Sequence, residues 1–554
     1  MKKIRHYFNK PLLITLLSFS VIGSVAYKSS KYFEISKHVD IFISLYKEID
    51  SYYVDDISPS EFIRTGIDAM LSSLDPYTTF ISESEVEDYR FMTTGEYGGI
   101  GAVISKKGKY IQVVEPYENS PADKAGLRAG DLIIEVDGKS VEGKSTTDVT
   151  GMLKGEPNSE VTLKILRGLS EEEVSKTLVR EEIKVKDVPY YGMVDDEVGY
   201  VKLSSFKQNC SQEIKEAMVD LKENHGMEKM VLDLRGNPGG ILNEAVRTVA
   251  LFVDKGELVV STKGKIKEWQ KEYHTYDKPV DKEMPIVVLT SSSSASASEI
   301  VSGAIQDLDR GVVLGEKTFG KGLVQQAKDL PYNAKVKMTI AKYYIPSGRC
   351  IQALDYSKKD NKRPVKYPDS LKTAFQTKGG RTVYDGDGVM PDIEVEPIDM
   401  PEVIVGLYNQ RLFFEFANRF REENDSIPPA RVFTVSDELY DDFVEFLEEK
   451  DYDYTTNAER KLANFKETAI KENYFEAIEP QYDSLYKALK HDKSEDLQTF
   501  KKLIVFLLAE EIVSRYYYQK GRIANALDHD PQLTEALKVL KNQQRYTDVL
   551  SLGD

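Results

Sequence analysis

The stretch that decides the fold of this chain is Met230-Val231-Leu232-Asp233-Leu234-Arg235-Gly236-Asn237-Pro238-Gly239-Gly240. Its first half is an almost unbroken apolar run, which is typical of a buried strand, and its glycine-rich second half predicts a tight turn before a helix from about Leu242. A second apolar run, over residues 285–290, precedes a serine-rich turn and an expected helix over residues 300–308. Repeated strand, turn and helix over residues 188–397 predict an α/β core with functional groups at the carboxyl ends of its strands.

Upstream of this core, residues 95–167 show short strands separated by glycines. The segment opens with Gly98-Gly99-Ile100-Gly101-Ala102, and a short helix is expected where Ser120-Pro121-Ala122-Asp123 begins. Alternating apolar positions over residues 161–165 indicate a closing strand. This order resembles a PDZ domain. In such a domain the N–H groups of the glycine loop bind a terminal carboxylate, and the adjoining strand edge pairs with an extended peptide.

Both ends of the chain have helical patterns. Near the N-terminus apolar residues such as Ile41, Leu45 and Ile49 recur at helical spacing, and the part after Met400 is acidic and rich in tyrosine. The latter carries no motif tied to chemistry, so we expect a scaffold or interaction domain, for an adaptor or for self-association. The expected division is a leader or anchor, an N-terminal helical domain, a PDZ domain, the α/β core and a C-terminal helical domain, over residues 1–27, 28–94, 95–170, 171–400 and 401–554.

Charge and composition exclude several classes of function. The formal net charge of −17 argues against a nucleic-acid surface, because no long basic face is available to neutralise phosphates. Cys210 and Cys350 are too few for a disulfide framework, although one bridge and two free thiols both remain open. The six histidines show no zinc-binding spacing, so a metal hydrolase is disfavoured and no metal or other cofactor is expected.

The first residues have the charge pattern of an export segment. Positive charges precede an uncharged, largely apolar stretch over residues 11–26, which gives about 24 Å of helix at about 1.5 Å per residue. Two interpretations are open: a signal peptide cleaved after Ala26, or a retained inner-membrane anchor over residues 11–27. In both, the positive charges stay in the cytoplasm and the body of the protein is expected in the periplasm or otherwise outside the inner membrane, secreted or anchored.

The serine-rich turn contains Ser294-Ala295-Ser296-Ala297-Ser298-Glu299-Ile300. Ser296 and Glu299 fit a capping box, in which the serine is the N-cap of a helix and the glutamate its third residue. The same position, between an apolar strand and a helix, is also where nucleophilic serines are exposed near the positive end of a helix dipole. The pattern permits both interpretations.

Lys321 favours the nucleophile. It lies between Gly320 and Gly322, which allow another backbone to approach closely. A lysine acts as a general base only when it is neutral, which requires burial that lowers its pKa from about 10.4. Gln325 follows four residues later, on the same side of an extended segment, and its uncharged amide is suited to orienting the amine. The glycines of the turn at residues 237–240 supply candidate N–H donors for an oxyanion, while Asp233 and Arg235 are expected to brace that turn.

These phrases together resemble serine peptidase family S41, the carboxyl-terminal processing peptidases or tail-specific proteases. The resemblance covers residues 40–397 in the family's order. It includes three further phrases: Leu74-Asp75-Pro76-Tyr77, Tyr343-Tyr344-Ile345-Pro346-Ser347-Gly348-Arg349 and Gly388-Val389-Met390-Pro391-Asp392.

The resemblance implies an α/β protease core of the ClpP/crotonase-like type with an inserted PDZ domain, an N-terminal helical unit and a C-terminal α-helical domain. It implies Ser296 as nucleophile, Lys321 as base, Gln325 as its orienting partner, and the N–H groups of Gly240 and Ala297 as the oxyanion hole. The implied activity is that of an exported serine endopeptidase that recognises protein substrates by their C-terminal tails. The implied peptide-binding loop consists of Gly98, Gly99, Ile100, Gly101 and Ala102.

Two rival functions stay open on the sequence. The first is a catalytically silent scaffold that binds peptides through the PDZ domain, although an inert core has no need for Ser296, Lys321 and Gln325 together. The second is an ordinary esterase that uses a histidine as its base. Loss of activity on mutation of Ser296 or Lys321, but of no histidine, would exclude both.

Overall fold

The computed structural model describes residues 32–168, 172–360, 363–450, 452–489 and 493–551. The chain divides after Pro76 into two compact units. In the described part of the first unit, a helix over residues 32–52 is followed by α2 (Pro59–Ser72), with Pro59 at the start of α2. No residue of α2 is buried within this unit.

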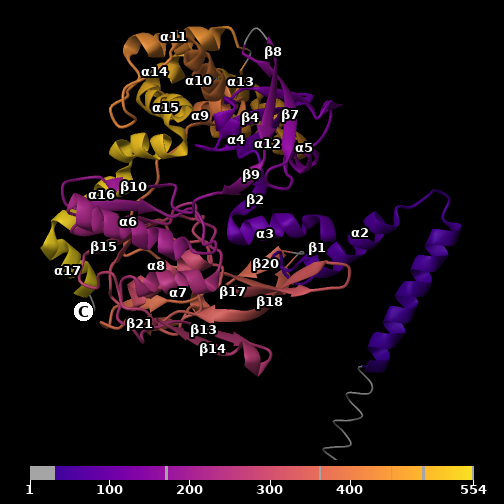
Figure 1. Cartoon of the computed structure of the whole chain (residues 1–554), viewed down its shortest axis with the longest axis vertical. Coiled ribbons are helices and arrows are strands. Elements are labelled where there is room, and N and C mark those ends of the chain that lie inside the picture. Colours follow the sequence, from indigo (N-terminus) through magenta and orange to yellow (C-terminus); the bar gives the residue numbers. More distant parts are fainter. Residues whose placement is uncertain (1–31, 169–171, 361–362, 451, 490–492, 552–554) are drawn as a thin grey trace, which may run out of the picture. The chain divides into compact units, whose positions relative to one another are not determined.

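The second unit is built around a six-stranded sheet with the order β10-β11-β12-β15-β16-β23. Figure 1 labels β10 and β15 of this sheet and the nearby helices α6 and α8. The strands β11 to β23 along this order run parallel, and β10 is an antiparallel edge. Their bounds are β10 Tyr190–Met193, β11 Val198–Lys202, β12 Lys229–Asp233, β15 Ile286–Thr290, β16 Val312–Gly315 and β23 Ile393–Glu394. The two apolar runs of the sequence are thus the adjacent central strands β12 and β15.

Both faces of this sheet are covered by helices. Leu232 and Val288 face a core shared with α6 (Cys210–His225), α7 (Leu242–Ala250) and α8 (Ala297–Asp307). Val231 and Val287, one position earlier on the same strands, face a second core completed by α16 (Pro531–Lys541) and α17 (Gln543–Ser551). Successive side chains of a strand point to opposite faces, which explains why both runs are apolar without interruption.

A second sheet in this unit has the order β1-β18-β13-β14, with β17 also paired to β18. Its strands are β1 Thr79–Ile81, β13 Leu258–Gly264, β14 Lys271–His274, β17 Leu323–Asp329 and β18 Lys335–Tyr344. The helical domain expected over residues 28–94 is therefore interrupted by a strand. The pairing partner of β1 lies more than 250 residues away in the sequence, so no local pattern indicates this strand.

The glycine-punctuated segment forms a separate sheet with the order β3-β4-β5-β7-β8, and β6 (Lys139–Ser140) pairs with β5. The strands are β3 Ala102–Lys107, β4 Tyr110–Pro116, β5 Leu132–Val136, β7 Glu160–Arg167 and β8 Glu172–Val179. The helices α4 (Pro121–Lys124) and α5 (Thr146–Leu153) complete its core. A short ribbon, β2 (Glu96–Gly99) with β9 (Glu181–Lys184), brings the two ends of this segment together.

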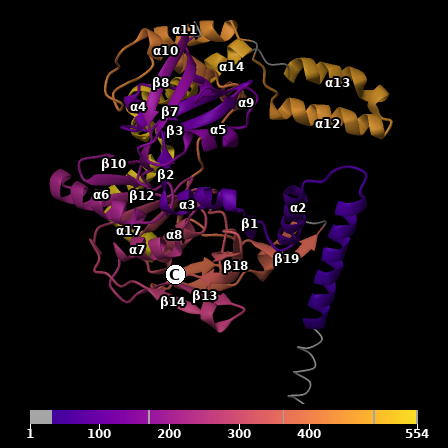
Figure 2. The same cartoon turned by 45° about the vertical axis from the view of Figure 1, so that its right-hand side comes forward.

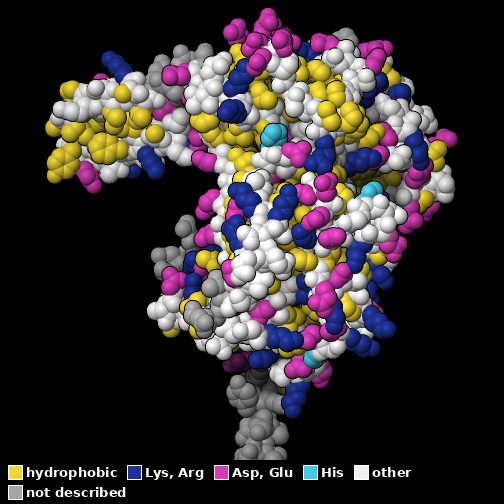
Figure 3. Space-filling view, turned by 90° about the vertical axis from the view of Figure 1, so that its left-hand side faces the viewer, with side chains coloured by type: hydrophobic (Ala, Val, Ile, Leu, Met, Phe, Trp, Pro, Cys, Tyr) yellow, Lys and Arg dark blue, Asp and Glu magenta, His cyan; other side chains and the backbone are white. Residues whose placement is uncertain are grey.

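The helices after residue 400 form two groups. The first has an apolar core with stacked and edge-on phenylalanine rings, such as Phe413, Phe416 and Phe443. It contains α9 Glu402–Asn409, α10 Leu412–Glu423, α11 Asp437–Glu448, α14 Lys493–Thr499 and α15 Lys501–Ala526, while α12 Asn457–Lys471 and α13 Phe475–Leu489 form a hairpin (Figure 2). The second group is α16 and α17, which belong to the core of the protease sheet. Figure 3 shows apolar side chains gathered on the arm at its upper left, the α12–α13 hairpin, where Phe465, Ile470 and Tyr486 are exposed.

The helix α15 is interrupted at Tyr518, whose φ of 56° and ψ of −164° are not helical. The hydroxyl of Tyr518 donates a hydrogen bond of 2.7 Å to Asp123 of α4, in the small domain. Two further contacts join α10 and its N-cap to the same small domain, Lys107 with Glu415 at 2.9 Å and Arg411 with Gln112 at 3.0 Å. The helical part therefore contacts the small domain at β3, β4 and α4.

Three other expectations concern the N-terminal segment, membrane-spanning helices and the two cysteines. The leader or anchor over residues 1–27 lies outside the described residues. Among the described residues, no helix is both long and apolar enough to cross a membrane. Cys210 and Cys350 are both free thiols, so the bridge left open by the sequence is absent.

Candidate active site

Ser296 lies in the turn between β15 and α8 and has an unusual backbone conformation. Its φ is 57° and its ψ is −111°, in a region that residues with side chains rarely adopt. Backbone strain of this kind is common at catalytic residues, where surrounding contacts hold it in place. Ser296 is also the residue directly before α8 and is half-buried, so the N-cap position and the nucleophile position expected from the sequence are the same residue.

A buried carboxylate joins the turn of Ser296 to the loop of Lys321. Oε2 of Glu299 accepts hydrogen bonds from the backbone N–H of Ser296 at 2.7 Å and of Lys321 at 2.9 Å. Its Oε1 accepts from Thr318 Oγ1 at 2.6 Å and from the N–H of Gly320 at 2.7 Å. Burial raises the pKa of Glu299, although these four donors oppose the shift. Glu299 thus fixes the two backbone segments relative to each other.

Tyr343 connects the same two segments from the other side. Its hydroxyl lies 3.0 Å from the carbonyl oxygen of Ser296 and 2.7 Å from that of Lys321, so it can donate to either. The ring is almost fully buried, and burial raises the pKa of Tyr343 well above its usual value. The amine of Lys321 lies over the ring of Tyr77, with Nζ 4.2 Å from the ring centroid.

The glycine turn packs directly against Ser296. A Cβ atom on Gly239, whose φ is 95°, would lie 2.8 Å from the Cβ of Ser296 and 2.8 Å from the nitrogen of Ala297. The N–H of Gly239 donates to Asn237 Oδ1 at 2.9 Å, and its carbonyl accepts from the N–H of Phe206 at 3.0 Å. In a trans peptide the next N–H, that of Gly240, points the opposite way from this carbonyl. The first N–H groups of a helix, here that of Ala297, also have no partner within the helix.

The residues beneath this turn form a charged brace, as the sequence indicated. Burial alone would raise the pKa of Asp233, but Arg235 and Lys202 outweigh it and hold the pKa well below its usual range. Arg235 donates to Asp233 at 2.7 Å and also pairs with Asp530, at 2.6 Å, in the loop before α16. The C-terminal segment therefore contacts the strand that leads into the glycine turn.

Gln325 lies on β17, where the register with β18 shifts between Val324 and Gln325. Its amide nitrogen lies 3.4 Å from Thr339 Oγ1 on β18. The sheet therefore positions this side chain by an amide–hydroxyl contact across two strands. Lys321 itself precedes β17.

The glycine loop of the small domain is held by its carbonyl groups. The carbonyl of Gly101 accepts from Ser120 Oγ at 2.8 Å, and that of Ile100 accepts from the N–H of Ala122 at 2.8 Å. The carbonyl of Gly98 accepts from the N–H of Gly155. Since each carbonyl is antiparallel to the following N–H, the N–H groups of Gly99, Gly101 and Ala102 point away from these partners. The strand β3 that follows the loop is at the edge of its sheet, with α5 beside it.

A strained serine between a buried strand and a helix, tied to a lysine and flanked by a glycine turn, defines a serine hydrolase of the α/β class. Family models identify three segments: peptidase family S41 over residues 197–357, a PDZ domain over residues 112–167, and "Probable PDZ-protease, C-terminal helical domain" over residues 403–540. A carboxy-terminal-processing protease of Bartonella bacilliformis is 35% identical over 330 residues, covering 59% of this chain and 74% of the relative. A probable CtpA-like serine protease of Staphylococcus aureus (strain MRSA252) is 32% identical over 442 residues, covering 76% and 88%. The chain belongs to the carboxy-terminal-processing proteases of peptidase family S41.

Two solved structures are also similar to parts of this chain. The photosystem II D1 C-terminal processing protease is 28% identical and covers 64% of this chain and 92% of its own, with a TM-score of 0.34. A PDZ domain of a carboxy-terminal protease from Vibrio cholerae, solved in complex with a peptide, is 31% identical and covers 16% and 99%, with a TM-score of 0.16. The family assignment depends on the sequence relatives alone.

The family, the domain types and the class of enzyme expected from the sequence are thus confirmed: a serine endopeptidase with an S41 core, a PDZ domain and a C-terminal helical domain. The structure brings Ser296, Lys321, Gly240 and Ala297 to one place. The sequence indicated Glu299 only as a helix cap, not as the group that joins the Ser296 and Lys321 segments. It indicated no role for Tyr343 or Tyr77. The capping signature was a usable signal, because it put a carboxylate three residues after the serine.

Proposed function

We propose that this protease cleaves peptide bonds with Ser296 as nucleophile and neutral Lys321 as general base, and that it selects exported proteins by their apolar C-terminal tails. The single observation that carries this proposal is the carboxylate of Glu299, which binds the N–H groups of Ser296 and Lys321 through one oxygen. A buried group that joins these two backbone segments holds their backbones close together, so that both side chains start from neighbouring positions. The positive φ of Ser296 is the second support, since strain is retained where a side chain must be presented.

The reaction follows from these positions. Neutral Lys321 removes the proton of the Ser296 hydroxyl as Oγ attacks the substrate carbonyl, and the N–H groups of Gly240 and Ala297 donate to the resulting oxyanion. When the C–N bond breaks, the ammonium of Lys321 returns the proton to the leaving amine. Neutral Lys321 then deprotonates a water molecule, which attacks the acyl-enzyme and releases the carboxylic acid with regeneration of Ser296.

Two neighbours of Lys321 are suited to this proton cycle. The face of Tyr77 favours the ammonium that forms during each transfer, because the ring face is negative. Gln325 supplies an uncharged amide on the strand that follows the loop, and in this proposal it orients the amine without fixing its charge as a carboxylate would.

Tail recognition is assigned to the PDZ loop and to β3. An extended peptide that pairs with the edge strand β3 would end at the loop, where the N–H groups of Gly101 and Ala102 point away from the partners of the preceding carbonyls and are offered to a terminal carboxylate. The positive charges before residues 11–26 support export and a location outside the inner membrane. Protease accessibility of the intact protein in whole cells, compared with lysed cells, tests the location.

The decisive experiment uses an unfolded reporter protein with and without an apolar C-terminal tail. We expect rapid cleavage of the tailed reporter by the native protein and a loss of about 10³- to 10⁶-fold in Ser296→Ala and Lys321→Ala. Ser292→Ala, an exposed serine of the same run, and Lys328→Ala, an exposed lysine of β17, are the matched controls and should retain activity. Full activity in either site variant would contradict the assigned roles, and tail binding without turnover by the native protein would favour a silent scaffold.

A further inference from the structure

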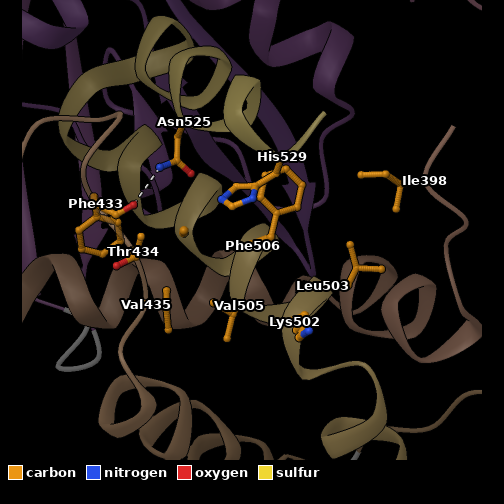
Figure 4. Close-up of a pocket in the computed structure, with 11 residues that line it drawn as sticks. Ile398, Phe433, Thr434, Val435, Lys502, Leu503, Val505, Phe506, Asn525 and His529 are labelled. Carbon is orange, nitrogen blue, oxygen red and sulfur yellow. Dashed lines mark hydrogen bonds between the residues drawn. The ribbon is translucent and has the colours of Figure 1, made fainter. Parts of the chain in front are cut away.

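The C-terminal helical part contains a pocket of about 440 Å³ that is separate from Ser296 and from the PDZ loop. Its inner wall is apolar and includes Phe433, Val435 and Ala509, all of them buried, with Phe506 beside them. Lys502 and His529 are exposed residues of the lining, and Figure 4 shows His529 between Asn525 and Phe506. A pocket of this size and composition is typical of sites that bind small molecules or a few side chains of a peptide.

One buried polar side chain in this pocket has an unused acceptor. Asn525 is 6% exposed, and its Nδ2 donates to the carbonyl oxygens of Ala430 at 2.7 Å and of Phe433 at 3.0 Å. These two bonds fix the orientation of the amide, because exchanging its oxygen and nitrogen would place an acceptor against two carbonyls. Within the described part of the chain, Oδ1 has no hydrogen-bond partner. Figure 4 shows this oxygen on the side of His529, away from the bond to Phe433.

The chemistry of the pocket defines its ligand. Buried acceptors are normally satisfied, so a ligand that reaches Asn525 must bring an N–H or O–H group. The apolar walls require apolar side chains on either side of that donor. Lys502, an exposed residue of the pocket lining, makes no ion pair with another described residue and is therefore available to an anion.

We propose that this pocket is a second peptide site, which binds the apolar C-terminal end of a protein or peptide. A backbone N–H of the ligand donates to Asn525 Oδ1, apolar side chains pack against Phe433, Val435 and Phe506, and the terminal carboxylate pairs with Lys502. An endopeptidase meets such ends in two forms, the original tail of its substrate and the new carboxyl terminus of each upstream product. A fatty acid would satisfy the walls and Lys502 but has no donor for Asn525, so we favour the peptide.

The test uses the full-length Ser296→Ala protein, so that binding is measured without turnover and independently of the role of Ser296. The probe is a six-residue apolar peptide with a free carboxylate and a photoreactive diazirine leucine, and cross-linked residues are located by mass spectrometry. Intact masses before irradiation verify that the probe is uncut. We expect cross-links at residues 433–435 and 502–509, in addition to any in the PDZ domain.

Three probe variants assign the contacts. Amidation of the carboxyl terminus removes the charge pair with Lys502, and N-methylation of the backbone removes the hydrogen bond to Asn525. Each change should reduce cross-linking at the pocket by about tenfold, because the bound peptide excludes the water that would otherwise replace the lost contact. Dodecanoic acid should compete poorly. Strong competition by dodecanoic acid, together with unchanged labelling by the two modified peptides, would overturn the proposal in favour of an acyl-chain site.

Two protein variants locate the site. Lys502→Glu, at an exposed position, should reduce pocket labelling by about tenfold and leave PDZ labelling unchanged, since it replaces attraction with repulsion. Lys487→Glu, an exposed lysine of α13, is the matched control for the change in charge. Ala509→Phe fills the pocket from its buried wall and should abolish labelling there, provided that its thermal midpoint shows a folded protein. Labelling confined to the PDZ domain and the protease core, or unaffected by both variants, would exclude this site.

Discussion

Ser296 lies in the turn proposed for catalysis and Gly101 in the loop proposed for tail binding, and both have a positive φ, 57° and 74°. At Gly101 this conformation carries no strain, because glycine has no Cβ. At Ser296 it costs about 1–3 kcal/mol, and the surrounding structure has to impose it. The two turns therefore differ in what they present: the PDZ loop offers backbone N–H groups, whereas the protease turn offers a side chain.

The contacts around the two residues match this difference. The carbonyl of Gly101 is held by Ser120 and by the N–H of Tyr117, both from one neighbouring segment. Ser296 is held by Glu299 and Tyr343, two buried side chains that also hold the backbone of Lys321. A turn that presents only backbone can use glycine, but a turn that presents a hydroxyl needs a buried polar network to hold its strain.

The largest expected effect comes from removing the Ser296 hydroxyl, either with the backbone strain retained or with the strain relieved. Ser296→Ala and Ser296→Gly should both lower kcat/KM by about 10³-fold or more. Only Ser296→Gly also relieves the strain of the positive φ. Its free energy of unfolding should therefore exceed that of Ser296→Ala by about 1 kcal/mol, and its thermal midpoint should be higher. Rates on the tailed reporter and calorimetric midpoints provide both measurements. Equal midpoints for the two variants would mean that the turn is not strained.

The second prediction breaks the network around the serine. Glu299→Gln replaces one carboxylate oxygen with an NH₂ group, which then faces N–H donors that need an acceptor. We expect a loss of about 3 kcal/mol in the free energy of unfolding and about 10²-fold in kcat, with KM little changed. Denaturant unfolding and steady-state kinetics measure these values.

Glu268→Gln, an exposed glutamate of the same core, is the control for this change and should behave like the native protein. If Glu299→Gln raised KM and left kcat unchanged, then Glu299 would act on substrate binding rather than on the position of Ser296 and Lys321.

The third prediction introduces a side chain at Gly101, in the PDZ loop. A Cβ on Gly101 would lie 2.4 Å from the Cβ of Ser120, so Gly101→Ala must displace the loop as well as strain it. We expect KM for the tailed reporter to rise about tenfold, while cleavage of the untailed reporter stays the same. Gly108→Ala is a close control in the same domain, because its φ is 58° but its Cβ would meet no atom within 4 Å. A similar rise in KM for both variants would attribute the effect to strain alone.

The smallest expected effect concerns pH and a carboxylate that belongs to neither turn. Burial raises the pKa of Asp187 from 3.8 to about 6, although Lys207 at 2.9 Å opposes the shift. Because the folded state holds this proton more tightly than the unfolded state, stability falls as the pH rises from about 4 to about 6. Asp187→Asn should flatten that decline in thermal unfolding, and the exposed Asp277→Asn should not. An unchanged slope in Asp187→Asn would contradict the raised pKa.

The sequence predicts the central strands of this molecule well, but it predicts poorly the contacts between segments that lie far apart in the chain. The strands β12 and β15 are evident because both of their faces are buried, which makes their residues continuously apolar. Ser296, Lys321 and the glycine turn could be selected because strand ends meet at one edge of a sheet. From the sequence, Glu299 was assigned only to a helix cap. A glutamate that caps a helix and one that also joins two loops can have the same spacing from the serine, so the sequence does not distinguish them. β1 and the packing of α16 depend on partners hundreds of residues away, which local patterns do not contain.

The position of α16 and α17 has a consequence for the order in which the protein is made. These two helices, over residues 531–551, cover the apolar face of the sheet that carries Val231 and Val287, and the hydroxyl of Tyr546 hydrogen-bonds to the backbone of Ile286. During synthesis the strands leave the ribosome long before these helices do. The sheet that presents Ser296 therefore keeps one face uncovered until α17 has been translated, and a chain stopped after the S41 segment lacks half of its core rather than an accessory domain.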